Sequence, residues 1–95
     1  MKINLSQTLN SIDGEPLADD GGALTLRRVI QTVCLNTLKG EEDVAGDLKW
    51  QLWKLANEAN QDEVEWTPEQ VSLIRERIGK GYGAVVVGPA WEAMG

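Results

Sequence analysis

The clearest helix start in this sequence is at Thr67, and it restricts the folds open to the chain. Thr67 is a favoured N-cap residue, Pro68 suits the first helical position because no N–H is needed there, and Gln70 is placed to bond back to the cap. The apolar residues that follow on one helical face are Val71, Ile74 and Ile78. We expect the helix to stop at Gly79, since glycine commonly follows a last helical turn.

Two further helices are expected before this one, over about residues 25–38 and 44–60. The first has Thr25 as N-cap and ends before Lys39-Gly40, and its inward residues are Leu26, Val29, Ile30, Val33 and Thr37, with Cys34 on the flank. The second follows an acidic run that complements the helix dipole, although Asp47 is an alternative start because Gly46 weakens the first turn. Its inward stripe is Leu48, Leu52, Leu55 and Ala59.

The N-terminal segment is predicted to form a β-hairpin over about residues 2–18. Ile3 and Leu5 alternate on one face, and Asp13-Gly14 is typical of a turn because glycine adopts positive φ without a steric clash. A second turn or loop is expected at residues 19–22, and residues 64–66 are expected to be extended. Two strands are not stable alone, so the helices must cover them.

The C-terminal segment contains the longest uninterrupted apolar stretch, Ala84 to Val87, for which a buried strand and an irregular core segment both remain open. Gly88-Pro89 interrupts it, and residues 90–94 fit one last helical turn. The sequence thus predicts one domain, residues 1–95, of α+β class. A short N-terminal β-hairpin packs on a three-helix core that the C-terminal apolar segment closes.

The composition excludes most catalytic and metal-binding chemistry, because the chain has no histidine and one cysteine. A serine or cysteine nucleophile lacks its usual base, and the ligands for a Cys/His metal site are too few. We expect Cys34 to be a buried core residue rather than a reactive thiol. The glycine-rich residues 79–83 follow a helix, not a strand, and are predicted to reverse the chain rather than bind phosphate. We therefore expect no enzymatic activity, no cofactor and no metal.

The charge balance, 15 acidic against 9 basic residues, disfavours nucleic acid and anionic membrane surfaces as partners. Residues 25–40 are basic and residues 41–66 acidic, a pattern that suits two packed neighbouring helices. Arg27 and Arg28 form the adjacent basic pair, either for an acidic partner or for pairing with the acidic segment. Since there is no apolar leader or membrane-length segment, and the single cysteine has no intramolecular partner, we expect a cytoplasmic protein.

Large apolar side chains that point away from the helix cores are the candidate partner-binding residues. Helical geometry places Trp50 about 200° and Trp53 about 140° around the axis from Leu48. Leu35 and Leu73 likewise lie off the inward stripes of their helices. Either these faces contact a protein partner or a second copy, or the hairpin and C-terminal segment cover them. The predicted set is Trp50, Trp53, Leu35, Leu73, Arg27 and Arg28.

Several short motifs resemble small proteins encoded by tailed phages and prophages. They are Ile12-Asp13-Gly14-Glu15-Pro16-Leu17, Leu24-Thr25-Leu26, the Lys- and Trp-rich run from Lys49 to Leu55, the cap at 67–70, and the Tyr82, Val85–Gly88 and Trp91 pattern at the end. The resemblance implies a non-enzymatic accessory role, either in virion or tail assembly or as an inhibitor of a host protein, and it brings no catalytic residues. The alternative is a nucleic-acid-linked transcriptional regulator that uses Arg27, Arg28 and Lys39.

Overall fold

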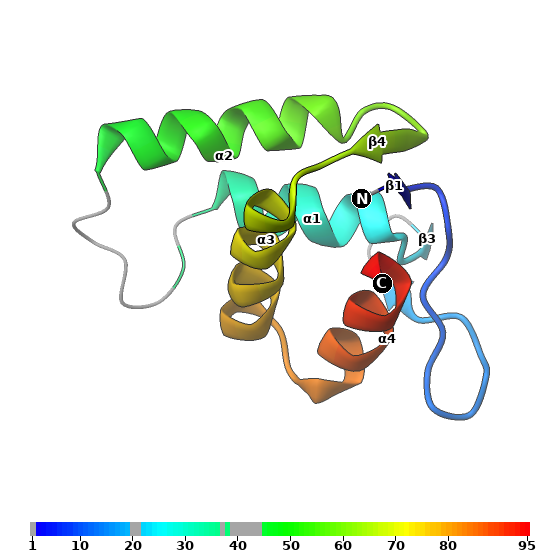
Figure 1. Ribbon diagram of the computed structural model, residues 1–95. Coiled ribbons are helices and arrows are strands. Elements are labelled where there is room, and N and C mark those ends of the chain that lie inside the picture. Colours follow the sequence, from blue (N-terminus) through cyan, green and yellow to red (C-terminus); the bar gives the residue numbers. More distant parts are fainter. Residues whose placement is uncertain (1, 20–21, 37, 39–44) are drawn as a thin grey trace.

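The computed structural model describes residues 2–19, 22–36, 38 and 45–95. Within these ranges the chain has an α+β fold, with four helices and two small antiparallel sheets (Figure 1). The elements in chain order are β1 (Lys2–Asn4), β2 (Ala18–Asp19), β3 (Gly22–Ala23), α1 (Leu26–Leu35), α2 (Gly46–Glu58), β4 (Glu63–Glu65), α3 (Pro68–Gly81) and α4 (Ala84–Met94). The predicted fold class is confirmed at this level, but the three-helix core is not.

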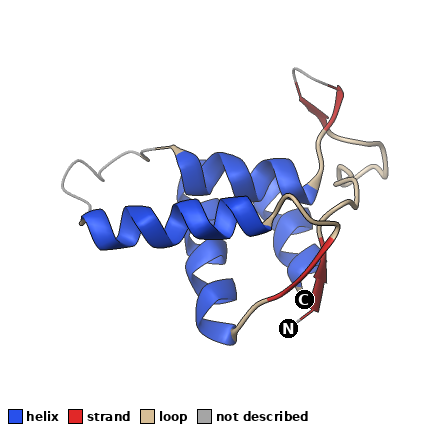
Figure 2. Cartoon of the chain, turned by 90° about the horizontal axis from the view of Figure 1, so that it is seen from above, coloured by secondary structure: helices blue, strands red, loops and turns tan. Residues whose placement is uncertain are grey.

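Helix α1 lies at the centre of the molecule and packs against α2, α3 and α4. Helix α2 runs alongside α1, while α3 and α4 lie on the side of α1 that faces away from α2 (Figures 1 and 2). The core therefore collects the inward faces of all four helices together with Ile3, Leu5 and Leu9 of the N-terminal segment. Because α1 is covered on several sides, α2 is left with one face on the core and one face outward.

Helix α1 begins as predicted and ends earlier. The Thr25 side chain caps it by accepting from the Arg28 N–H at 3.2 Å. All the predicted inward residues that the structure describes are buried: Leu26, Val29, Ile30, Val33 and Cys34. The helix stops at Leu35 because Asn36 is extended and its side-chain amide donates to Thr32 O at 2.8 Å, a local bond that competes with further helix. Thr37 and the predicted Lys39-Gly40 ending lie outside the described residues.

Helix α2 is shorter than the predicted span of 44–60. It has Ala45 at the N-cap position with no side-chain cap bond, so Asp47 is not the cap. Leu52, Leu55 and Ala59 are buried as predicted, and Leu48 in the first turn is half-buried. The acidic run before this helix lies outside the described residues.

Helix α3 carries the predicted capping box in full. Thr67 Oγ1 accepts from Gln70 N at 3.2 Å, and Gln70 Oε1 accepts from Thr67 N at 2.9 Å. The expected stop at Gly79 is wrong, because the helix continues to Gly81. Packing outweighs the roughly 1 kcal/mol helix cost of glycine. A Cβ at Gly79 would lie 3.4 Å from the Trp91 ring, an ordinary van der Waals contact, so this part of the helix packs closely against α4.

The predicted hairpin over residues 2–18 is confirmed only in its inner part, residues 9–17, where Asn10 and Pro16 form an antiparallel bridge across the turn; its outer strand pairs elsewhere. β1 pairs with β4, some sixty residues later, with Ile3 opposite Val64, and both of these side chains are buried. Joining two buried side chains across the core gains more than a local hairpin would. The turn itself is correct: Gly14 has φ of 84°, and Leu17 N donates to Leu9 O at 2.9 Å. Residues 63–65 are extended, close to the predicted 64–66.

The C-terminal apolar run is neither a strand nor an irregular segment, and the final helical turn is part of a longer helix. α4 covers the whole of Ala84–Met94 with Pro89 inside it. Val86 N and Val87 N both donate to Gly83 O at 3.0 Å, which starts the helix. Trp91 Nε1 donates to Arg75 O at 3.1 Å and ties α4 to α3. The predicted three-helix core is therefore a four-helix one, because this anchoring stabilises a helix that valine-rich sequence alone does not favour.

Candidate protein-interaction face

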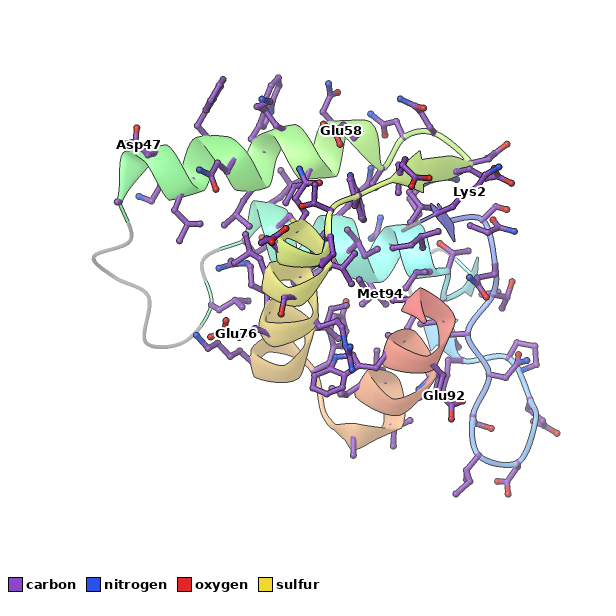
Figure 3. All side chains as sticks on the ribbon, in the orientation of Figure 1. Lys2, Asp47, Glu58, Glu76, Glu92 and Met94 are labelled. Atoms are coloured by element: carbon purple, nitrogen blue, oxygen red, sulfur yellow. The ribbon has the colours of Figure 1, made fainter. Side chains whose placement is uncertain are left out.

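Trp50 and Trp53 lie next to each other on the outward side of α2. They are 60% and 55% exposed, whereas Leu52 and Leu55 of the same helix are buried. The predicted outward direction of Trp50 is confirmed, and residues three apart on a helix are surface neighbours. Figure 3 shows side chains standing out from α2 between Asp47 and Glu58, where no other element of the described chain covers the helix.

Two lysines flank the tryptophans. The Lys54 ammonium lies 4.5 Å from the centre of the Trp50 ring, within the range of a cation–π interaction. Lys49 is also exposed, and the two lysines are the charged residues of the segment 48–57. We call Lys49, Trp50, Trp53 and Lys54 the tryptophan face. It is an aromatic and locally cationic surface on a chain whose net charge is −6.

The core side of α2 is held in place by side chains of α1. Arg27 Nε donates to Ala59 O at 2.9 Å, and its Nη2 donates to Gln61 O at 3.1 Å and Asp62 Oδ1 at 2.8 Å. Gln31 Nε2 donates to Ala56 O at 3.1 Å. Arg27 therefore holds the C-terminal end of α2 in place. Of the two roles predicted for it, this is pairing with the acidic segment of the same chain rather than with an acidic partner. Because the Arg27 guanidinium is engaged, the nucleic-acid hypothesis loses one of its three proposed contacts.

The other predicted partner-binding residues do not all join the tryptophan face. Leu35 is exposed in the last turn of α1. Arg27 bonds to Ala59 and Gln31 bonds to Ala56, so the two helices run antiparallel and Leu35 lies beside the first half of α2. Leu73 is half-buried against the core and lines a small hollow between α2 and α3. Arg28 is exposed on α1. The structure thus brings Trp50 and Trp53 together and leaves Leu73 in the packing between helices.

Two buried polar anchors were missed in the sequence analysis. Arg77 of α3 is buried, with Nε donating to Val33 O at 2.7 Å and Nη2 to Asn36 O at 3.1 Å. The Trp66 indole is 1% exposed and donates to Glu58 Oε2 at 2.7 Å. Helical geometry places Arg77 about 60° from Ile74, at the edge of the inward stripe of α3, and this position indicated that its side chain could be buried. These anchors keep the helices, and with them the tryptophan face, in one orientation.

Cys34 is buried as predicted, and we expect its burial to make the stability of the chain depend on pH. Burial raises the pKa of its thiol from 9.0 to about 11, with the Arg77 charge acting in the opposite direction. The unfolded chain loses this proton at lower pH than the folded chain. The free energy of unfolding should therefore fall as the pH rises through that window, by up to about 2–3 kcal/mol.

Urea unfolding at pH values below and within this window tests the effect. The stability of the Cys34→Ala variant should fall less over this pH range than that of the unaltered chain, because the variant has no thiol that titrates differently in the folded and unfolded states. An identical fall in both chains would contradict the assignment to Cys34. In the same experiment, a thiol reagent should label the unaltered chain only after unfolding.

The glycine-rich residues 79–83 join two helices. α3 ends at Gly81, Tyr82 is the C-cap residue, and Gly83 is the N-cap residue of α4. The chain passes from α3 into α4 at Tyr82 and Gly83, later than the predicted stop at Gly79, and a helix follows in place of the strand or irregular segment left open by the sequence. A phosphate loop would follow a strand, which this junction does not. Within the described residues, no three His, Cys, Asp or Glu side chains converge as a metal site would need.

No protein-family model, curated protein or solved structure matches the chain. Among the helices that the structure describes, none has the length and apolar character needed to cross a bilayer. The assignment of a function therefore depends on the surfaces of the molecule itself.

Proposed function

We propose that this chain is a non-enzymatic protein that binds another protein through the tryptophan face. The observation that supports this is the adjacent exposure of Trp50 and Trp53, each more than half accessible although the chain has only four tryptophans. Tryptophan is strongly enriched among residues that dominate binding energy at protein interfaces. The two exposed indoles contribute little to the packing of α2, because the opposite side of this helix already supplies its core contacts.

The charges of the tryptophan face indicate the character of the partner. Lys49 and Lys54 rim the two indoles, so the complementary surface is an apolar patch bordered by carboxylates. This favours a separate partner over a second copy of the chain, because a two-fold contact through this face would bring like charges together. The proposed binding surface lies on α2, not on the basic part of α1 that the nucleic-acid alternative would require.

The resemblance to small phage and prophage proteins supports a narrower proposal. The chain would be an accessory factor in virion or tail assembly, with a phage structural protein as its partner, or an inhibitor of a host protein. Both roles require binding without catalysis, which fits the lack of histidine. Affinity purification from phage-infected cells distinguishes them by whether a phage structural protein or a host protein is captured.

The Trp50→Ser/Trp53→Ser variant is expected to lose the captured partner. Two central aromatic contacts contribute enough that the Kd should rise at least about 100-fold. Gln51→Ser is the matched control, since Gln51 is exposed on the same helix but lies outside the tryptophan face. It should bind as the unaltered chain does. The measurement is titration of the purified partner into each variant.

Two results would contradict this proposal. Equal partner affinity in the double variant and the Gln51→Ser control would remove the tryptophan face from binding. A mass in sedimentation that falls from dimer to monomer in the double variant would assign the face to self-association instead. The nucleic-acid alternative requires duplex DNA binding that weakens steeply with salt, and we expect no such binding.

A further inference from the structure

A groove lies between the N-terminal segment and α4, on a part of the molecule away from α2. One wall is formed by residues 7–13 and the other by one side of α4, and the volume between them is about 1080 Å³. Gln7 Nε2 donates to Ala93 O at 3.4 Å, which links the two walls. In Figure 3, Glu92 stands on the side of α4 that faces the N-terminal segment.

The first wall contains an extended stretch, residues 7–11, that forms isolated β-bridges with two other parts of the chain, and residues 12–13 belong to the turn that follows. The odd-numbered residues of this stretch are paired: Leu9 N donates to Leu24 O, Leu9 O accepts from Leu17 N, and Ser11 N donates to Glu15 O, at 2.9, 2.9 and 2.7 Å. Thr8 and Asn10 form β-bridges whose hydrogen bonds come from these neighbours. Since backbone groups of successive extended residues point to opposite sides, the N–H and C=O groups of Thr8 and Asn10 lie on the edge that no other described residue pairs.

The side chains around this edge are apolar and acidic. Ile12 is fully exposed in the turn that follows the extended stretch, and Val85 on α4 is 66% exposed. The ionisable residues of the lining are Asp13 and Glu92, both carboxylates. A ligand that fits the groove therefore carries apolar groups, positive charge and a backbone able to hydrogen-bond with the open edge of the extended stretch.

We propose that the groove binds an extended, basic peptide segment of another protein by adding it as a strand beside Thr8–Asn10. The two residues offer two N–H and two C=O groups, which is the main-chain recognition used in strand addition. Alternate side chains of the added strand face Ile12 and Val85, while a lysine or arginine pairs with Asp13 and Glu92. This site is separate from the tryptophan face and does not depend on it.

The test is a titration of the ¹⁵N-labelled full chain, followed by NMR, with a synthetic seven-residue peptide of alternating valine and lysine, blocked at both ends. We expect saturable amide shifts at Thr8, Asn10 and Val85 below about 1 mM peptide. A peptide methylated on alternate backbone nitrogens should bind at least about tenfold more weakly, because it loses two hydrogen bonds. A peptide with glutamate in place of lysine should lose affinity to at least a similar extent.

A pair of charge reversals locates the binding. Glu92→Lys should weaken the valine–lysine peptide at least about fivefold. Glu76→Lys makes the same change in net charge on α3, where Glu76 pairs with Lys80 at 3.3 Å. It should weaken peptide binding only by the small amount that the altered net charge causes. Equal weakening by both variants, no saturable shift, or shifts outside residues 7–13 and α4 would overturn the proposal. Sedimentation showing that the chain pairs with itself through this edge would overturn it too.

Discussion

Replacing Arg77 by methionine is expected to lower the free energy of unfolding by about 2–4 kcal/mol. Methionine retains most of the apolar stem, but the guanidinium donors to Val33 O and Asn36 O are lost. These carbonyls lie at the end of α1, where backbone acceptors have no partner within the helix and a cation is favourable. The variant leaves the buried Val33 carbonyl and the partly buried Asn36 carbonyl without the guanidinium at the junction of α1 and α3.

Urea unfolding followed by circular dichroism measures this effect. The free energy of unfolding of Arg77→Lys should lie between those of the unaltered chain and Arg77→Met. Its ammonium keeps the positive charge but lacks the planar guanidinium that reaches both carbonyls. Arg75→Met is the matched control on the same helix. Arg75 stacks over Trp91 at 4.7 Å and its buried Nε lacks a partner, so its loss should cost about 1 kcal/mol or less. Equal stability of Arg77→Met and the unaltered chain would remove Arg77 from its capping role.

Replacing Trp66 by alanine is the second large effect, with an expected loss of about 3–5 kcal/mol. Trp66 is the largest side chain in the core and joins the end of β4 to α2 through its bond to Glu58. Alanine leaves a cavity between these elements and also frees the Glu58 carboxylate. Because the chain is small, this loss takes a large part of its total stability.

Three variants separate the contributions to this effect. Trp66→Phe keeps much of the apolar contact and loses the indole N–H, so it should cost less than alanine. Glu58→Gln keeps an acceptor but removes its charge, and should cost about 1 kcal/mol. Trp50→Ala makes the same chemical change at an exposed position and should change stability by about 0.5 kcal/mol or less. Comparable losses at Trp66 and Trp50 would contradict the assignment of Trp66 to the core and Trp50 to the surface.

These anchors connect stability to the proposed binding. Arg27 holds the end of α2 from the α1 side, and Glu58 in its last turn holds Trp66. The inward side of α2 is therefore attached at its C-terminal end, and the tryptophan face points outward as a consequence. A preorganised helix loses less entropy on binding than one that must be ordered.

Local features were predicted well. The Thr67 capping box and the inward stripes of α1 and α3 depend on contacts within a few residues, which the sequence states directly. Spacing on α2 alone was enough to place Trp50 on the outward side. Leu73 shows the limit of this reasoning, because its position around the helix does not reveal that α2 approaches from that side.

Long-range features were not predicted. No local rule links Ile3 to Val64, and the pairing of β1 with β4 follows from burying both side chains in one core. The α4 helix contains a valine run and Pro89, both of which argue against a helix on propensity alone. The groove beside Thr8 exists only because this helix lies across from the extended N-terminal stretch.

The sequence alone therefore determined the starts of α1 and α3, most of the inward residues of the first three helices, the acidic net charge and the absence of histidine. Each of these follows from residue type and spacing. The tertiary structure decided the strand partner of β1, the helical state of residues 84–94, the internal role of Arg27 and the burial of Arg77. Those outcomes depend on which surfaces meet, and the free energy of such contacts is shared between segments far apart in the chain.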